Sequence, residues 1–444
     1  MGVALDRGGT VTVLRGRAFL MLLLASLLGA SLAGAPPAAP APVWQRVAPG
    51  VEYRWFDVPS SRGTARAHLL SVDLGNARVS AGLLYPGVVA ARSPLSTLAD
   101  GAGAVGGVNG DFFHLSENQH PGVEATGAPV GPAVADGRPL KAAVPNGQRF
   151  GPALPPGTNT RQVLGIGEDG LARVGELVLD GTVSSPEGEL ELGGLNQYAL
   201  PVDSVGVFTK DWGAASRVRA TCGTDTRRDA PCSSETYEVT VRGGQVVAVA
   251  ETPGRGAIAP GTEVLVGREA GARELRRMAV GDHVNVTYAL VADGQVAERG
   301  AYRFAVGGYP VLRGGEPLSG MDRVTPAVRT AAGVGEGGRR LLLLALDGGP
   351  GFRTGLTVVE VADALRDLGA SDAVNLDGGG SSTLVARKNG AAKVSVLNHP
   401  SGGAQRAVPN GIGVFVRGED APQGRGQAQG LRLLTTSAVA ETPL

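Results

Sequence analysis

Residues 375–382, NLDGGGSS, place an amide, a carboxylate, three glycines and two hydroxyls directly after a short apolar segment. A carboxylate at the end of a strand can act as a general base or a nucleophile, so Asp377 is the first candidate catalytic residue. Glycine loses much conformational freedom on folding, so Gly378, Gly379 and Gly380 require a geometric reason. Either the backbone turns through left-handed conformations, or its N–H groups face a closely bound ligand. The simpler alternative is a glycine-rich hairpin turn without a function.

Other polar residues also lie at the ends of apolar segments, where neighbouring strands would gather them around one cleft. These candidates are Asn109, Asp111, Arg329, Asp347, Arg406 and Asn410. Carboxylates supply the chemistry of glycosidic cleavage and guanidinium groups bind phosphate, so the set suits an anionic sugar substrate. Taken one at a time, the arginines are more simply explained as members of surface ion pairs.

Several other chemistries find no support in the sequence. The segment 333–338, GVGEGG, matches G-x-G-x-x-G, but no helix follows it, which indicates a hairpin turn rather than a dinucleotide site. The chain has no P-loop and no G-x-S-x-G motif, and Ser381 and Ser382 have no evident histidine partner. The two cysteines and five histidines lack the spacing of metal ligands, so we predict neither a metal nor a cofactor.

The bulk composition indicates a β-rich globular protein. Hydrophobic residues make up 43% of the 444 residues, and 70 glycines with only 4% aromatic residues favour tight turns and small-residue packing. The formal net charge is zero, and no block of like charge occurs, so a nucleic-acid surface is not expected.

Short apolar segments that alternate with turn signals predict the elements that must position these side chains. We expect strands at 68–74 and 341–346 and a hairpin formed by 237–241 and 245–249. Thr357 and Glu360 form a capping box for a helix over 357–368, and a second helix is expected over 269–278. The predicted fold class is α+β, with mixed β-rich sheets, few helices and an inserted β-rich subdomain over 210–300.

The two ends of the chain are expected to lie outside the folded domain. Arginines precede an apolar segment that ends in Ala33-Gly34-Ala35, which is typical of a cleaved export signal over 1–35. An uncleaved membrane anchor is the alternative, because the apolar segment approaches a spanning length. We assign 36–50 to a Pro/Ala-rich linker, 51–417 to the main domain and 418–444 to a flexible tail, and expect a secreted or envelope location without a membrane span after cleavage.

Cys222 and Cys232 are the only cysteines, and they lie ten residues apart in a polar loop. Because the chain is expected to be exported into an oxidising compartment, we predict a disulfide between them.

Six segments together resemble the phosphodiester glycosidase family over residues 65–416. They are VNGDFF (108–113), GAPVGPAVADGRPL (127–140), VRTAAGV (328–334), LALDGG (344–349), GLTVVEVADALRDLGASDAVNLDGGGSSTLV (355–385) and NHPSGGAQRAVPNGIGVF (398–415). In this family an Arg often follows the D-G pair directly, whereas this chain has Gly349 there. The family also has members with H-P before R-T, whereas this chain has Thr325-Pro326-Ala327-Val328 there. The chain is rich in arginine and poor in lysine, and together with the export signal this composition is typical of a bacterial protein.

The resemblance implies hydrolysis of a sugar-1-phosphodiester at the anomeric C–O bond, on cell-envelope or exopolysaccharide material. In that interpretation Asp377 and Asp347 activate water or attack directly, and Arg329 and Arg406 stabilise charge on the phosphate. The residues expected to bind substrate are Asn109, Asp111, Arg329, Asn375, Gly378, Gly379, Gly380, Ser381, Arg406 and Asn410. The alternative is a non-catalytic glycan-binding or envelope-assembly protein with the same fold.

Overall fold

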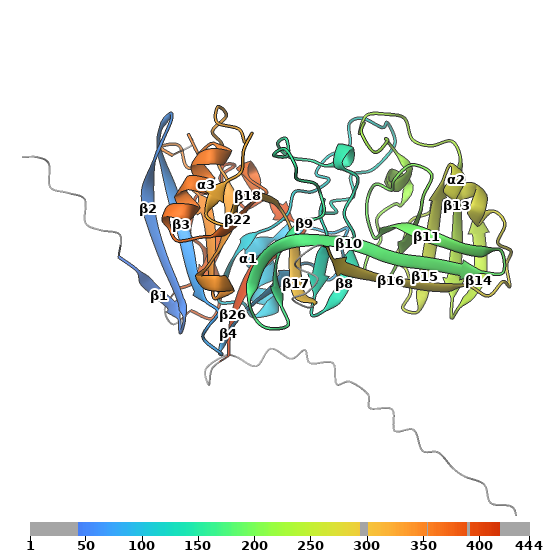
Figure 1. Ribbon diagram of the computed structural model, residues 1–444, viewed down its shortest axis with the longest axis horizontal. Coiled ribbons are helices and arrows are strands. Elements are labelled where there is room, and N and C mark those ends of the chain that lie inside the picture. Colours follow the sequence, from blue (N-terminus) through green and yellow to red (C-terminus); the bar gives the residue numbers. More distant parts are fainter. Residues whose placement is uncertain (1–42, 294–300, 353, 389–390, 418–444) are drawn as a thin grey trace, which may run out of the picture. The chain divides into compact units, whose positions relative to one another are not determined.

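Three β-sheets dominate the structure, a computed structural model that describes residues 43–293, 301–352, 354–388 and 391–417 (Figure 1). This architecture confirms the predicted α+β class. The predicted export signal and C-terminal tail lie outside the described residues. Among the residues that are described, no helix is long and apolar enough to cross a membrane.

The eight-stranded sheet has the order β1-β2-β3-β21-β20-β22-β18-β19 and is antiparallel throughout. Its strands are β1 (Gln45–Ala48), β2 (Val51–Ser60), β3 (Gly63–Asp73), β18 (Tyr309–Arg313), β19 (Glu316–Pro317), β20 (Thr330–Gly335), β21 (Arg340–Leu346) and β22 (Asp372–Leu376). Strand β1 corrects the predicted linker, because residues 45–48 pair with β2 rather than extending as a spacer.

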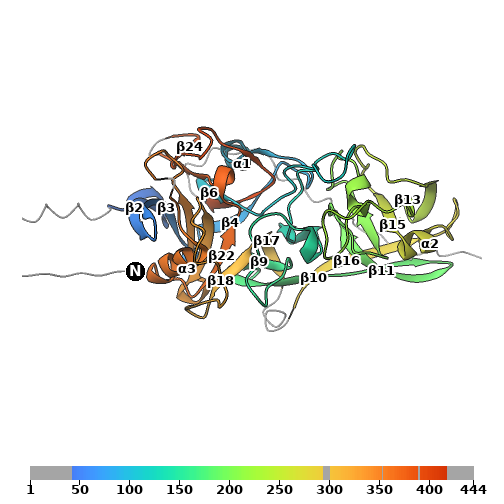
Figure 2. The same cartoon turned by 90° about the horizontal axis from the view of Figure 1, so that it is seen from above.

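The eleven-stranded sheet contains the region that was expected to form a subdomain. Its strands are β7 (Ala133–Ala135), β8 (Arg138–Lys141), β9 (Gln162–Gly167), β10 (Ala172–Ser185), β11 (Gly188–Leu195), β12 (Val205–Phe208), β13 (Thr236–Arg242), β14 (Gln245–Ala250), β15 (Thr262–Arg268), β16 (Asn285–Ala292) and β17 (Tyr302–Gly307). The long strand β10 pairs with β9 near its start and with β16 and β11 further along, so it connects the two halves of the sheet (Figures 1 and 2). The described strands of the region 210–300 therefore belong to the same sheet as β7–β12 and β17.

The five-stranded sheet has the order β24-β23-β6-β26-β4, and a small two-stranded sheet lies beside it. The strands are β4 (Val79–Leu84), β6 (Gly106–Asn109), β23 (Leu384–Arg387), β24 (Val394–Val396) and β26 (Gly411–Val416), with β5 (Ser93–Pro94) and β25 (Ala407–Val408) in the small sheet. Strands β22 and β23 lie in different sheets, so the glycine-rich segment between them is a crossover rather than the hairpin that we considered.

The described α-helices are α1 (Leu95–Ala102), α2 (Ala270–Leu275) and α3 (Val358–Asp367), and short 3-10 turns cover Asn146–Gln148, Val218–Thr221, Glu336–Gly338 and Gly379–Ser381. The predicted capping box begins α3, since the Glu360 N–H donates to Thr357 Oγ1 and the Thr357 N–H donates to Glu360 Oε2. Helix α2 is shorter than the predicted 269–278. Helix α3 packs against β18 and β22 (Figure 1).

The burial of β21 on both faces explains its continuous apolar sequence. Leu342, Leu344 and Leu346 point to the core that also contains residues of α3, which we call the first core. Leu341, Leu343 and Ala345 point to a second core shared with the other two sheets. Side chains alternate along a strand, so neighbouring residues at the ends of β20, β21 and β22 are directed to opposite sides of the sheet.

Candidate active site

The ends of strands from all three sheets meet around Asp111 and Asp377. The Asp377 N–H at the end of β22 donates to the Gly110 carbonyl at the end of β6, with an N···O distance of 2.9 Å. The end of β17 contributes Gly307, where an added Cβ atom would lie 2.3 Å from Asp111 Oδ2. The convergence of strand ends, predicted from the sequence, thus brings two carboxyl groups together.

The carboxyl group of Asp377 is poised to change protonation state near neutral pH. Burial raises its pKa to about 6, against the lowering effects of Ser381 and of the Arg406 guanidinium. The nearby charge of Asp111 raises the pKa further. A carboxyl group with a pKa in this range suits general acid–base catalysis.

Asp111 is the more deeply buried of the two carboxyl groups, with an exposed fraction of 3%. Burial raises its pKa, while a hydrogen bond from the Gly131 N–H (2.6 Å to Oδ2) and the charge of Lys141 lower it. Lys141 is fully buried and donates to the carbonyls of Val130 and Gly131, so burial lowers its pKa in turn. Asp111 is therefore coupled electrostatically to a buried lysine, whereas Asp377 is coupled to the partly buried Arg406.

The Arg406 guanidinium lies near Asp377 and Ser381. Its Nη1 donates to Ser381 Oγ at 3.3 Å, and its charge lowers the pKa of Asp377. Arg406 is only partly buried and forms no ion pair with any residue in the described part of the chain. Its remaining donors are therefore available to an anion.

Geometry explains two of the three glycines after Asp377. An added Cβ atom at Gly378 would lie 2.6 Å from the Val328 carbonyl, and Gly379 has a φ of +60°, whereas at Gly380 an added Cβ atom would displace the Arg406 guanidinium. The N–H groups of Gly379 and Ser381 already donate to protein carbonyls. The expectation that N–H groups along this segment are free to face a ligand is therefore wrong for these two residues.

Asn109 and Asn410 position the two aspartates from buried sites. Asn109 is fully buried; its Nδ2 donates to the Asp377 carbonyl at 2.7 Å, and its Oδ1 accepts from Thr330 Oγ1 and the Thr383 N–H. Asn410 Oδ1 accepts the Asp111 N–H at 2.9 Å. These bonds favour positioning roles over the direct substrate contacts that we predicted for both residues.

Arg329 and Asn375 lie on the first-core face of the sheet, beside Tyr309. Arg329 Nε donates to the Leu356 carbonyl and its Nη2 to the Thr325 carbonyl, so much of its donor capacity is used within the protein. Asn375 Nδ2 donates to the Leu376 carbonyl, whereas its buried Oδ1 makes no well-formed hydrogen bond to any described residue. Burial raises the pKa of Tyr309 to about 12, so its phenol remains protonated.

Asp347 lies at the same edge of the eight-stranded sheet but belongs to another cluster. Its Oδ2 contacts His399 Nδ1 at 3.0 Å and His68 Nε2 at 3.4 Å, and its Oδ1 accepts the Gly349 N–H. Burial opposes ionisation, but the Gly349 and histidine hydrogen bonds outweigh it and lower the pKa of Asp347. Asp347 and Asp377 were predicted to lie around one cleft, and no hydrogen bond joins the two side chains among the described residues.

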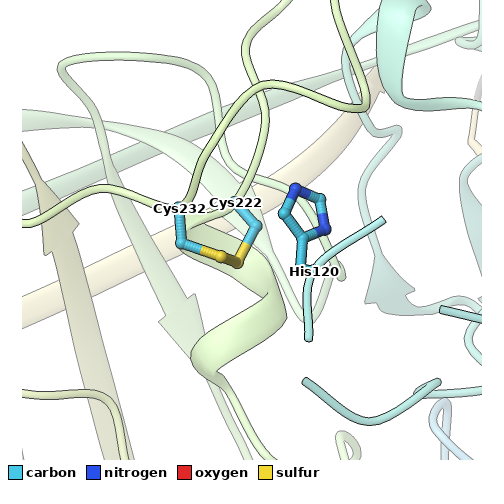
Figure 3. A group of neighbouring side chains, drawn as sticks. All are labelled: His120, Cys222 and Cys232. Carbon is cyan, nitrogen blue, oxygen red and sulfur yellow. A yellow bond between two sulfur atoms is a disulfide. The ribbon is translucent and has the colours of Figure 1, made fainter. Parts of the chain in front are cut away.

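Cys222 and Cys232 are joined by a disulfide, which confirms the predicted pairing. Figure 3 shows the His120 ring beside this bridge, although nothing in the sequence spacing suggests their proximity. The His120 Nε2–H donates to the Ala230 carbonyl at 2.8 Å. Thiolates are the metal-binding form of cysteine, so the oxidised pair does not fit a metal centre.

Lys141, Arg149 and Tyr309 lie at the site but are not among the residues predicted for it. Lys141 is one of four lysines in the chain, and a lysine within the predicted strand-rich core could have been a signal. Arg149 lies in a loop, where its charge alone gave no reason to separate it from the other arginines. The electrostatic effect of Asp111 on Arg149, and of Arg149 on Tyr309, identifies these residues as neighbours.

The fold and this site define a β-rich α+β protein with paired carboxyl groups and arginines at the ends of its strands. Residues 235–415 match the phosphodiester glycosidase family, which confirms the resemblance for this part of the chain. The matched region contains Asp377 and Arg406 but not Asp111. No curated protein matches the chain.

Solved structures support the fold. A hypothetical protein from Synechocystis has a TM-score of 0.64 and 21% identity over 86% of this chain, which spans 64% of the length of that protein. A protein from Burkholderia pseudomallei, named as an exported protein, has a TM-score of 0.60 and 24% identity over 79% of this chain and 74% of its own. The catalytic domain of zebrafish N-acetylglucosamine-1-phosphodiester alpha-N-acetylglucosaminidase aligns at a TM-score of 0.41 and 17% identity, covering 83% of this chain and 85% of that one.

Proposed function

We propose that this protein is an exported phosphodiester glycosidase that hydrolyses a sugar-1-phosphodiester at the anomeric C–O bond. The family match over 235–415 supports the reaction class. The arginine-led apolar segment at the N-terminus and the likeness in fold to a protein named as exported support a location outside the cytoplasm. Material of the cell envelope or an exopolysaccharide is the proposed source of substrate.

The observation that carries the proposal is a carboxyl group with a pKa of about 6 beside an arginine without a carboxylate partner in ion-pair contact. In its ionised form, Asp377 accepts a proton from water or attacks the anomeric carbon itself. Arg406 binds the phosphate through its remaining donors and stabilises the charge that grows as the phosphate leaves.

Asp111 replaces Asp347 as the second carboxyl group of the proposed reaction. Burial favours its protonated form, so it can donate a hydrogen bond or a proton, while Lys141 stabilises the carboxylate once the proton has left. In the overall reaction, the anomeric C–O bond breaks and the oxygen of water forms the new bond to the sugar. The bridging oxygen stays with the phosphate.

Isotope labelling tests which bond breaks. The mature protein is incubated in heavy-oxygen water with a panel of sugar-1-phosphodiesters, and both products are analysed by mass spectrometry. We expect the label in the released sugar and none in the phosphomonoester. Label in the phosphate would mean P–O cleavage and would overturn the glycosidase assignment.

The same panel separates the enzyme from its alternative, a glycan-binding protein. Saturable binding of a sugar phosphodiester without release of sugar would favour the binding protein. The variant Asp377→Asn serves as the control, because any activity of a contaminating hydrolase would survive this substitution.

A further inference from the structure

The disulfide closes a loop of residues 222–232, and carbonyl groups of this loop accept hydrogen bonds from the side chain of Gln148. Gln148 is 1% exposed and lies against the loop. Its Nε2 donates to the Thr224 carbonyl at 2.6 Å and to the Arg227 carbonyl at 3.3 Å. The loop carbonyls that Gln148 contacts thus lie within the ring that the Cys222–Cys232 bond closes.

Residues in and next to the loop also form hydrogen bonds with Gln148 and Arg149. Arg219 Nη2 donates to Gln148 Oε1 at 2.9 Å, and the Tyr198 hydroxyl donates to the Gln148 carbonyl at 2.8 Å. Arg228 Nη1 donates to the carbonyl of Arg149, the next residue, at 2.7 Å. The side chain and carbonyl of Gln148 and the carbonyl of Arg149 are therefore all fixed, which limits where the Arg149 side chain can point.

Arg149 points toward the aspartate site. Its guanidinium lies 5.5 Å from the centre of the Phe112 ring and 5.8 Å from that of Tyr309. It lines a small cavity together with Asp111, Gly131, Thr160, Gly308 and other residues. The charge of Asp111 is close enough to affect its ionisation.

This cation has no carboxylate within ion-pair distance among the described residues. Its Nη1 donates to the Gly151 and Pro152 carbonyls, and no other side-chain hydrogen bond of Arg149 is formed there. Arg149 is partly buried, and a partly buried guanidinium without an anionic contact carries a cost, because burial removes water from the charge. A bound anion would supply the missing partner.

We propose that Arg149 is a second phosphate-binding residue of the active site, and that the disulfide loop positions it through Gln148. The inference rests on the proposed function for the identity of the anion. Arg406 and Arg149 then hold the phosphate from two sides of the carboxyl pair. Gln148 and the Cys222–Cys232 bond act as positioning elements and touch no substrate.

The main alternative is that the loop only stabilises the fold. A structural role would lower the melting temperature without a selective effect on phosphate binding. The experiment therefore measures the dissociation constant of inorganic phosphate by calorimetry, alongside the melting temperature and the KM and kcat for a sugar-1-phosphodiester. Phosphate binding needs no turnover, so its result is independent of the proposed reaction.

Arg149→Met should weaken phosphate binding by about tenfold or more, as expected for the loss of charge-assisted hydrogen bonds. Gln148→Leu should weaken it by a smaller factor at a similar melting temperature. In the double variant, Gln148→Leu should add no further effect, because the residue that it positions is already gone. Arg277→Met, which removes a half-exposed arginine that pairs with Glu274, is the matched control and should leave phosphate binding unchanged.

Reduction of the disulfide gives a second test that does not depend on the Gln148 variant folding. Under a mild reductant, the wild-type protein should bind phosphate more weakly, whereas Arg149→Met should show no additional loss. Unchanged phosphate binding by Arg149→Met would overturn the inference even if the enzyme hydrolyses sugar phosphodiesters. Equal, additive losses on reduction in both proteins would assign the loop a purely structural role. If the wild-type protein shows no turnover but Arg149→Met loses phosphate binding, the anion site is retained and the proposed reaction is rejected.

Discussion

Asp377 and Asp347 end two strands of the same sheet at the same edge, yet their surroundings are opposite. Strand β20 pairs antiparallel with both β21 and β22, so these two strands run in the same direction. Two strand spacings separate their ends, or about 10 Å. The pKa of Asp377 is raised, whereas that of Asp347 is lowered.

The alternation of side chains explains this difference. Thr330 pairs with Ala345 on one side and with Leu376 on the other, so all three face the second core. Asp347 lies two residues after Ala345 and faces the same way, toward His68. Asp377 lies one residue after Leu376, and its strand therefore directs it to the opposite side. Asp347 lies two residues after Ala345, whereas Asp377 lies one residue after Leu376. This difference of one residue places Asp347 beside histidines and Asp377 beside Arg406.

The comparison teaches that an aspartate at a strand end is not by itself a catalytic signal. Asp347 accepts hydrogen bonds that stabilise its charge, and these hold its pKa below the usual value. Asp377 is partly buried, and the burial raises its pKa to about 6 because Ser381 and Arg406 offset it only in part, so pH changes around that value alter its protonation. The following predictions test whether this contrast in environment corresponds to a contrast in role.

The largest effect is expected for Asp377→Asn, which keeps the side-chain volume and removes the charge. If the carboxylate is the base or nucleophile, turnover should fall by about 10²-fold or more. In the wild type, kcat/KM should rise with pH through an apparent pKa of about 6 as Asp377 ionises. Initial rates from pH 4 to 8 measure the turnover of the variant and the pH dependence of wild-type kcat/KM. Near-normal turnover by the variant would show that Asp377 is only a turn residue.

The same variant should also be more stable at neutral pH. The folded-state pKa of about 6 exceeds the ordinary value of 3.8, so the native state holds this proton more tightly than the unfolded state. Stability is then favoured at low pH and declines between about pH 4 and 6 as the carboxyl group ionises. Removing the charge should restore at most about 3 kcal/mol at pH 7, less where water screens the group. Urea unfolding at pH 4 and pH 7 should show a gain only at pH 7.

Arg406→Met should have the next largest effect, expressed mainly in substrate affinity. Loss of a charge-assisted contact with the phosphate should raise KM by about tenfold to a hundredfold. The loss of a neighbouring positive charge should also raise the pKa of Asp377, since Arg406 lowers it in the wild type. The acidic limb of the rate profile should therefore shift to higher pH, and an unshifted limb would separate Arg406 from Asp377.

Much of the fold could be predicted because local rules determine it. The apolar run of β21 and the capping box of α3 each specify their element through neighbouring residues. NLDGGGSS could be selected because its glycines have a geometric cause, which the contact at Gly378 and the positive φ of Gly379 provide. The role of its N–H groups could not be predicted, since it depends on the Val328 carbonyl, which lies far away in the sequence.

The composition of the site was harder to predict because it depends on pairing between sheets. The face toward which Asp347 points follows from its register with β3 and β20, and a sequence does not show which strands pair. Arg149 and Lys141 meet Asp111 only because loops and strands of a second sheet pack beside β6. His120 likewise reaches the disulfide across more than a hundred residues, without a local motif.

Asp347→Asn should affect stability more than activity. The substitution removes a charge that the Gly349 N–H and two histidines stabilise, at a cost of about 1–3 kcal/mol. Because the folded-state pKa is depressed, this stabilisation is present above about pH 4 and is lost as the pH falls further. Turnover should stay within about threefold of wild type. A loss of turnover as large as that of Asp377→Asn, with unchanged stability, would return Asp347 to the catalytic set.

The smallest effect is expected for His399→Ala, which tests whether the second cluster has any part in the reaction. The His399 side chain is 77% exposed, although its Nδ1 lies 3.0 Å from Asp347. The exposed His399 imidazole contributes about 0–1 kcal/mol, because water solvates it when it does not contact Asp347. Asp347 keeps its bonds to His68 and Gly349 in the variant, so its charge remains stabilised. Urea unfolding and steady-state rates should therefore both lie close to wild type. A tenfold loss of kcat at unchanged stability would instead show that His399 and Asp347 act together on the substrate, and the two faces of the sheet edge would then form one site.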